Sequence, residues 1–137
     1  MSETGRESEA APAALVIGHQ DFAAGIVSAV TAITGRTDLF RTLSNRGLDT
    51  RATEALVRDA IADGVRIIFT DLPAGSTTMA ARRAQRDHPD VTVVTGVSLP
   101  VLLDFAFALP GVDQAVESAV EKGRAAMMIS RGVLRAD

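Results

Sequence analysis

Apolar and polar residues along the chain fall into blocks typical of strands and helices that alternate. The run ALVIG at residues 14–18 is continuously apolar and ends in glycine, which is typical of a strand buried on both faces. Residues 21–34 place apolar side chains at helical spacing, and Gly35 stands at the expected C-terminal stop. We therefore expect a buried strand that leads directly into a helix.

The same order then repeats along the chain. A weak strand at 37–43 precedes the polar loop SNRGLD and a helix over about 50–62, which Asp49 or Thr50 is placed to cap. The remaining expected elements are the strand VRIIFTD at 65–71, a helix at 76–87, the strand VTVVTG at 91–96, a helix at 100–109 and, after Pro110-Gly111, a last helix at about 112–130.

This alternation predicts an α/β fold: a single domain with an open, mostly parallel sheet of four or five strands and helices on both faces. Four strands are clear, and a fifth strand or an edge exchanged between subunits stays open. The acidic, polar residues 1–12 are expected to be a disordered tail, which leaves 13–137 as the domain.

Composition narrows the class of protein. The 137 residues are 47% hydrophobic and 23% charged, and the net charge of −3 gives no footprint for nucleic acid or an anionic membrane. The absence of cysteine excludes disulfides, thiolate metal sites and a cysteine nucleophile. No apolar run reaches the roughly 18 residues of a membrane span, and the N-terminus lacks the pattern of a signal peptide. We expect a cytoplasmic protein.

Four loops should meet at the carboxyl edge of the predicted sheet, where ligands bind in open α/β folds. They cover residues 18–21, 43–49, 71–76 and 96–100, so His19 and Asp71 are expected to come close together. A carboxylate that accepts a proton from one imidazole nitrogen leaves the other free as a base, a metal ligand or a nucleophile.

Helix N-termini add a second element to this edge. Gly75 and Ser76 begin a helix whose unpaired N–H groups suit an anion such as phosphate, so a nucleophilic His19 beside them would be a phosphoryl acceptor. Simpler interpretations stay open at this point. His19 is also explained as a helix-start residue that bonds the backbone, and Asp71 as a turn cap.

Other functional classes fit the residues less well. An aspartyl-phosphate receiver domain needs an acidic pair after its first strand and a lysine after its last, yet Gly18-His19-Gln20 follows the first strand and the one lysine is Lys122. The glycine-rich nucleotide motifs GxGxxG and GxxxxGK[ST] are absent. A metal site is disfavoured, because His19 has no accompanying histidine or cluster of carboxylates.

Three segments, in the same order and spacing, resemble the IIA component of the mannose family of the bacterial sugar phosphotransferase system. They are VIGHQDFAAGIVSAV, RIIFTDLPAGSTTMAARRA and VTVVTGVSLPVLLDFAF, and the similarity covers roughly residues 14–109. The mannose, fructose and amino-sugar branches share these motifs, so the sugar stays open. The related dihydroxyacetone-kinase subunit fits less well, since its Ser-His-Ser start is absent.

The resemblance implies a role for each matching residue. His19 matches the histidine that takes a phosphoryl group from the phosphocarrier HPr and passes it to a IIB component. Asp71 matches the carboxylate that orients that imidazole, and Gly75 and Ser76 match the turn around the phosphoryl group. Further loop residues expected to contact docking partners are Gln20, Ser44 and Ser98.

The chain also departs from the family's pattern. Gln20 stands where a glycine is usual, Ala74 replaces the first glycine of a pair, and Thr77-Thr78-Met79 replaces Pro-Phe-Asn. These changes leave the nucleophile and its partner in place but alter the rim of the phosphoryl site.

The sequence thus predicts a cytoplasmic phosphotransferase that works through phosphohistidine, beside a membrane permease of IIC and IID components. A covalent relay between side chains requires no metal or other cofactor. The alternative is a regulatory sensor of the same fold that is not coupled to sugar transport, and a third possibility is a binding protein that is never phosphorylated. The nearly uninterrupted apolar stretch VSLPVLLDFAFAL at 97–109 and the resemblance both predict a homodimer.

Overall fold

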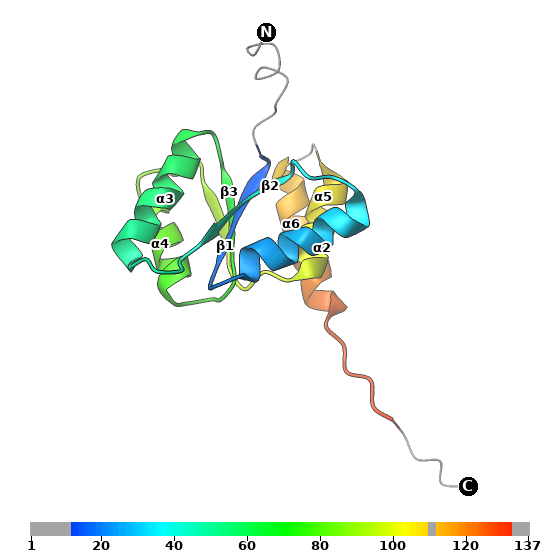
Figure 1. Ribbon diagram of the computed structural model, residues 1–137. Coiled ribbons are helices and arrows are strands. Elements are labelled where there is room, and N and C mark those ends of the chain that lie inside the picture. Colours follow the sequence, from blue (N-terminus) through cyan, green and yellow to red (C-terminus); the bar gives the residue numbers. More distant parts are fainter. Residues whose placement is uncertain (1–11, 110–111, 133–137) are drawn as a thin grey trace, which may run out of the picture. The chain divides into compact units, whose positions relative to one another are not determined.

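The computed structural model describes residues 12–109 and 112–132, and their backbone divides after Leu99 into two compact units. Nearly all of the expected disordered tail and the expected break at Pro110-Gly111 lie outside the described residues. The first unit contains β1 (Ala14–Gly18), α2 (Phe22–Thr34), β2 (Phe40–Ser44), α3 (Thr50–Ala62), β3 (Ile67–Thr70), α4 (Ser76–Gln85) and β4 (Thr92–Val94) (Figure 1).

The sheet of the first unit has four parallel strands in the order β2-β1-β3-β4. β1 lies between β2 and β3, and all of its residues are buried, as its continuous apolar sequence predicts. The expected α/β fold with an open parallel sheet is therefore confirmed. Within the described residues the sheet has four strands, so the fifth that the sequence left open is not part of it.

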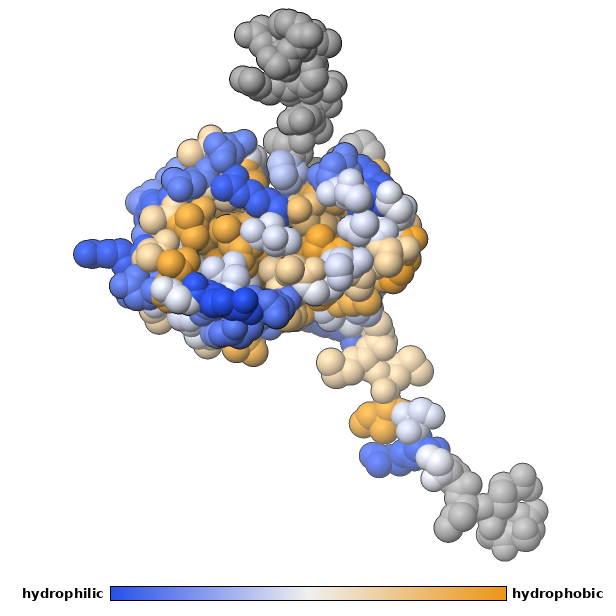
Figure 2. Space-filling model, viewed as in Figure 1, coloured by the Kyte–Doolittle hydropathy of each residue, from blue (hydrophilic) through white to orange (hydrophobic). Residues whose placement is uncertain are grey.

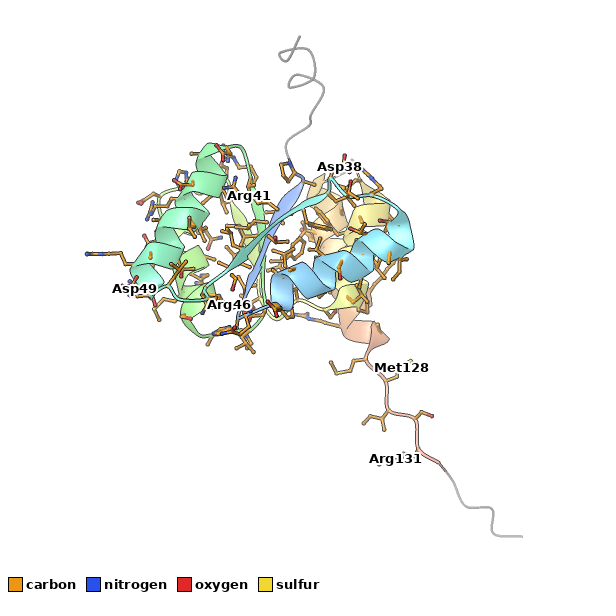
Figure 3. The ribbon with its side chains drawn as sticks, viewed as in Figure 1. Asp38, Arg41, Arg46, Asp49, Met128 and Arg131 are labelled. Carbon is orange, nitrogen blue, oxygen red and sulfur yellow. The ribbon has the colours of Figure 1, made fainter. Side chains whose placement is uncertain are left out.

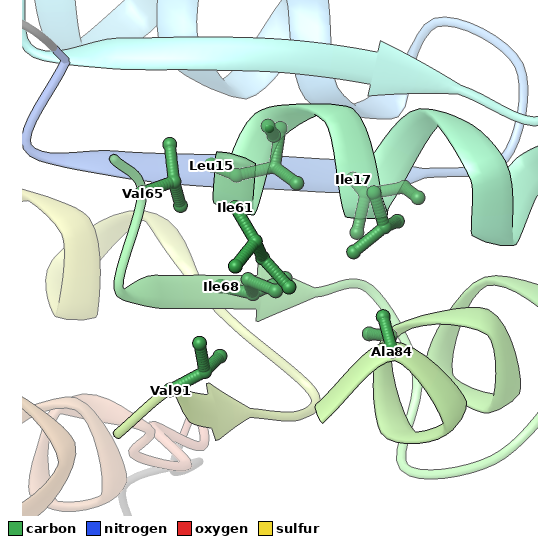
Figure 4. Close-up of a cluster of buried hydrophobic side chains, with 10 residues drawn as sticks. Leu15, Ile17, Ile61, Val65, Ile68, Ala84 and Val91 are labelled. Carbon is green, nitrogen blue, oxygen red and sulfur yellow. The ribbon is translucent and has the colours of Figure 1, made fainter. Parts of the chain in front are cut away.

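Helices cover both faces of this sheet. One face carries an apolar cluster to which β1, β3, α3 and α4 contribute, with Leu15, Ile17 and Ile68 from the strands (Figure 4). Successive strand residues point to opposite faces, so Gly18 faces away from Ile17. A Cβ added at Gly18 would lie 2.6 Å from the Phe22 ring, which places α2 on the second face.

Local signals in the sequence set the helix ends. Asp49 caps α3 and accepts a hydrogen bond from the Ala52 N–H at 2.8 Å, which decides between the two expected caps. Gly35 ends α2 in the left-handed conformation at φ 75°, where its N–H bonds the Thr31 carbonyl. Several observed elements are a few residues shorter than expected, because fraying ends lose the ladder bonds that define them.

The second unit holds α5 (Leu99–Ala108), apart from its first residue, and α6 (Val112–Ala126). Lys122 Nζ lies 3.2 Å from Asp104 Oδ1 and joins the two helices. The expected extension of the last helix to residue 130 is wrong, since α6 ends at Ala126. Met127, Met128 and Ile129 follow the end of α6, and these three side chains are all exposed (Figure 2).

Candidate functional site

His19 and Asp71 meet at the carboxyl edge of the sheet, as the topology of parallel strands predicts. His19 follows the last residue of β1, and Asp71 follows the last residue of the neighbouring strand β3. The His19 Nδ1 atom lies 2.7 Å from Asp71 Oδ2, and the His19 backbone N–H donates to the same oxygen at 2.8 Å. Ring and backbone of the histidine are thus fixed to one carboxylate oxygen.

The side chain of Asp71 is largely buried, and both of its oxygens accept hydrogen bonds. Its side chain is 8% exposed, and its second oxygen, Oδ1, accepts a bond from the Thr77 hydroxyl at 2.7 Å. Burial raises the pKa of Asp71, but the bonds from the His19 backbone, the His19 ring and Thr77 outweigh it, and the net pKa is lowered. The carboxylate is therefore ionised at neutral pH and acts only as an acceptor.

An ionised acceptor at Nδ1 defines the state of the imidazole. Nδ1 must carry the proton that Asp71 accepts, so in the neutral ring the lone pair lies on Nε2. The His19 side chain is 43% exposed, in contrast to the buried Asp71. The pair therefore presents a nucleophilic or basic nitrogen at the protein surface.

The turn after Asp71 brings the start of α4 to the same edge. Gly75 has φ 115° and ψ −178°, a conformation that is essentially restricted to glycine, and α4 begins at the next residue. The first N–H groups of a helix have no intrahelical partner, and at this helix start no N-cap side chain bonds them. The Ser76 hydroxyl accepts a bond from the Asn45 amide at 3.0 Å.

The loop between β2 and α3 borders the histidine on its other side. The Asn45 N–H donates to the Gly18 carbonyl at 3.4 Å. Arg46, labelled in Figure 3, donates from Nε to Gln20 Oε1 at 2.8 Å and from a terminal nitrogen to Asp21 Oδ1 at 2.5 Å. Gln20 itself has φ 49°, the left-handed region that non-glycine residues seldom adopt.

The structure places the expected docking residues in different settings. Gln20 and Ser44, with Arg46, line a hollow of ≈ 150 Å³ beside the start of α2. The Ser44 hydroxyl accepts a bond from the Arg46 N–H at 3.0 Å, so it shapes the loop. Ser98 lies in the segment that connects β4 to α5 and is half-buried. It neither lines this hollow nor takes part in the hydrogen bonds to Asp71.

Sequence reasoning assigned no role to Arg46, named Asn45 only as a residue of a loop at this edge, and named Thr77 only as part of an altered rim. A signal for Thr77 existed, since it falls on the buried face of α4, about one turn before Ala80 and Ala81 and two turns before Ala84. A signal for Arg46 existed too, because it is the one arginine or lysine in the loops 18–21, 43–49 and 71–76. Their partners, however, depend on how the loops fold against one another.

Among residues 12–109 and 112–132, no group of three or more His, Cys, Asp or Glu side chains is placed to hold a metal ion. Over the same ranges, no helix has the length and apolar character to span a bilayer.

Several solved structures with the same fold are IIA components of bacterial phosphotransferase systems. The PTS IIA protein associated with the fucose utilization operon from Streptococcus pneumoniae has a TM-score of 0.74 and 24% identity, over 87% of this chain and 93% of that one. The mannose/sorbose specific IIA subunit from Enterococcus faecalis has a TM-score of 0.72 and 19% identity, over 92% and 100%. Component EIIA from Streptococcus agalactiae has a TM-score of 0.76 and 17% identity, over 85% and 95%.

These likenesses establish the fold, and a family model extends them to the sequence. No curated protein matches the chain significantly. The model described as "PTS system fructose IIA component" matches residues 13–123, which is most of the chain and includes every residue of the site described above. The chain therefore belongs to the mannose- and fructose-type IIA components of the sugar phosphotransferase system.

Proposed function

We propose that this chain carries phosphoryl groups on His19 Nε2, taking them from phospho-HPr and passing them to a IIB component for sugar uptake. The observation that supports this most directly is the 2.7 Å contact between His19 Nδ1 and the ionised Asp71. It leaves the lone pair on Nε2 of a side chain that is 43% exposed, and an in-line attack on phosphorus requires such a lone pair. Membership in the IIA family supports the choice of donor and acceptor.

In the transfer step, the Nε2 lone pair forms a bond to phosphorus. The bond between phosphorus and the donor atom breaks, and its electrons stay with HPr. The proton on Nδ1 does not move, so the ring of phospho-His19 carries positive charge, which the Asp71 carboxylate stabilises. Transfer to a IIB component reverses these changes, and the ring returns to the neutral form.

The start of α4 supplies donors for the phosphoryl oxygens. Its first N–H groups lie next to Ser76, and helix N-termini favour anions. Because the donor and acceptor are brought together by protein docking, positioning supplies much of the rate. We propose that this chemistry uses neither a metal nor another cofactor, since every bond change involves only the two side chains and the phosphoryl group.

The protein's setting follows from the same proposal. We infer that the chain works in the cytoplasm, peripherally at the membrane with its IIC and IID permease, and without nucleic acid. We also infer a homodimer. The Phe107 side chain on α5 is 67% exposed, and Met127, Met128 and Ile129 after α6 are exposed by 86%, 82% and 78%, which is apolar surface that a second copy would cover.

Phosphorylation in a defined mixture tests the proposal. The wild type, His19→Ala and His88→Ala are incubated with phosphoenolpyruvate, enzyme I and HPr, and their intact masses are measured. His88→Ala is a matched control, because the chain has two histidines and His88 lies in the turn after α4. We expect one phosphate on the wild type and on His88→Ala, and none on His19→Ala. An unmodified wild type beside phosphorylated HPr would refute the proposal.

A further inference from the structure

The site contains one positive side chain whose place in the chemistry the transfer step above leaves unassigned. Arg46 is the only arginine or lysine in the three loops that surround His19. Its backbone adjoins Asn45, which bonds the Gly18 carbonyl, and its guanidinium bonds Gln20. The Arg46 guanidinium and the backbone next to Arg46 thus contact the two residues that flank His19 in the sequence.

Phosphorylation changes the electrostatics of this edge strongly. In the free protein, Asp71 and Asp21 contribute two negative charges and Arg46 one positive charge. A phosphoryl group on Nε2 adds about 1.5 to 2 further negative charges. Apart from the imidazolium ring itself and the N–H groups at the start of α4, Arg46 is the group in these loops that offsets them.

The ion pair between Arg46 and Asp21 is exposed and weak. Its side chain is 56% exposed and that of Asp21 is 85% exposed, and such surface pairs contribute about 0–1 kcal/mol. A phosphoryl dianion accepts charge-assisted, bidentate bonds from a guanidinium, which are stronger than an exposed carboxylate pair. The balance therefore favours exchange of Arg46 from Asp21 to the phosphoryl group once His19 is modified.

Gln20 fixes the position of the Arg46 guanidinium in the free protein. Its left-handed backbone, φ 49°, costs a non-glycine residue roughly 1–2 kcal/mol, yet it directs the Gln20 side chain toward Arg46 Nε. A glycine at this position would have no side chain to hold the arginine. The left-handed Gln20 and Arg46 are thus linked by one hydrogen bond.

We propose that Arg46 is a positioning residue for the phosphoryl group on His19: it rests on Gln20 and Asp21 in the free protein and pairs with the phosphoryl oxygens after transfer. This inference rests on the proposed phosphorylation of His19. Its consequence is thermodynamic, because a cation that binds only the phosphorylated form shifts the exchange equilibrium with HPr toward this chain.

The test compares that equilibrium in matched variants. Phosphorylated chain and unmodified HPr are mixed without phosphoenolpyruvate, and both phosphorylated species are quantified by ³¹P NMR. Arg46→Ala should shift the equilibrium toward phospho-HPr by roughly three- to tenfold, as expected for loss of one exposed charge-assisted contact. Arg46→Lys should retain part of the effect. Arg51→Ala, which removes an exposed arginine on α3 that lines a different groove, should match the wild type.

Two readouts separate this role from a structural one. The pKa of the phosphoryl group, titrated by ³¹P shift, should be higher in Arg46→Ala, because Arg46 favours the dianion against the opposing charges of Asp21 and Asp71. The difference between wild type and Arg46→Ala should also shrink at about 1 M salt, where the screening length is about 3 Å.

The outcomes distinguish this proposal from the proposed function. If the wild type is phosphorylated and Arg46→Ala matches both it and Arg51→Ala in equilibrium and phosphoryl pKa, Arg46 is no more than a loop contact and this proposal is overturned. If the wild type takes no phosphoryl group from phospho-HPr, the proposed function is refuted, and this proposal with it. If Arg46→Ala proves poorly folded by circular dichroism, the same comparison with Arg46→Gln decides.

Discussion

Replacing Asp71 by asparagine should preserve the fold and weaken the phosphorylated state. The amide oxygen can take the place of Oδ2 and accept both bonds from His19, at 2.7 and 2.8 Å. The amide NH₂ group then faces the Thr77 hydroxyl, which can rotate to accept from it. Every polar group keeps a partner, so the substitution removes a charge and leaves no buried group unpaired.

The size of the effect follows from the strength of the bonds that change. Hydrogen bonds to a charged group contribute about 1.5–3 kcal/mol, against about 0.5–1.5 kcal/mol for neutral pairs. The Asp71 side chain is 8% exposed, so solvent screens it little. We therefore expect Asp71→Asn to destabilise phospho-His19 by about 1–2 kcal/mol. This shifts the exchange equilibrium roughly five- to thirtyfold toward phospho-HPr.

The assay is stopped-flow or quenched transfer from phospho-HPr, combined with the equilibrium measurement, on wild type and Asp71→Asn. Both should have the same circular dichroism spectrum. Asp71→Asn should be slower in both directions and should lie further toward phospho-HPr at equilibrium. Rates and an equilibrium equal to those of the wild type would refute the reasoning and would reduce Asp71 to a turn residue.

Asp71 also makes stability depend on pH in a defined direction. Its folded pKa is lowered from the ordinary value of 3.8, so the folded state binds this proton less readily than the unfolded chain. Its contribution is therefore complete above about pH 4 and is lost as the pH falls through the folded pKa. Urea unfolding between about pH 5 and pH 2 should show a shallower loss of stability in Asp71→Asn than in wild type, and equal slopes would contradict the assigned pKa direction.

Three further substitutions test the scaffold and the assembly. Gly18→Ala should lower the free energy of unfolding in urea by about 1–3 kcal/mol, because the added Cβ would clash with the Phe22 ring. The control Gly25→Ala adds a Cβ that meets nothing within 4 Å and should not destabilise the protein. Thr77→Val should raise the pKa of Asp71, seen by ¹³C NMR titration, and an unchanged pKa would contradict the role of that hydroxyl. Phe107→Glu should convert a wild-type dimer to chains of 14.3 kDa in light scattering, and a wild type already at 14.3 kDa excludes the dimer.

The sequence predicted the fold well because the strands are buried on both faces. The runs ALVIG and RIIF have no polar alternation, which is typical of parallel strands under two layers of helices. The contact of His19 with Asp71 was predictable for the same reason, since the carboxyl ends of neighbouring parallel strands share an edge. The Asp49 cap was among the two candidates that the pattern offered.

The contacts between the loops could not be predicted, because they depend on loop geometry that local sequence patterns do not encode. The bond from Arg46 to Gln20 joins residues 26 positions apart and requires a left-handed Gln20, a conformation that sequence propensity disfavours. The end of α6 was placed too late because Met127-Met128-Ile129 is as compatible with a helix as with an extended segment. Ser98 was expected to contact docking partners because its loop follows a strand, and this stays a prediction, since a docking contact does not depend on the hydrogen bonds around Asp71.

Nitrogen-detected NMR of the phosphorylated protein, with ¹⁵N-labelled histidine, tests the central claim most directly. The chain has two histidines, so the spectrum contains two rings that His88→Ala assigns without ambiguity. The account predicts phosphorus coupled to Nε2 of His19, with the proton retained on Nδ1 beside Asp71. Phosphorus on Nδ1, on His88 or on no histidine at all would contradict it.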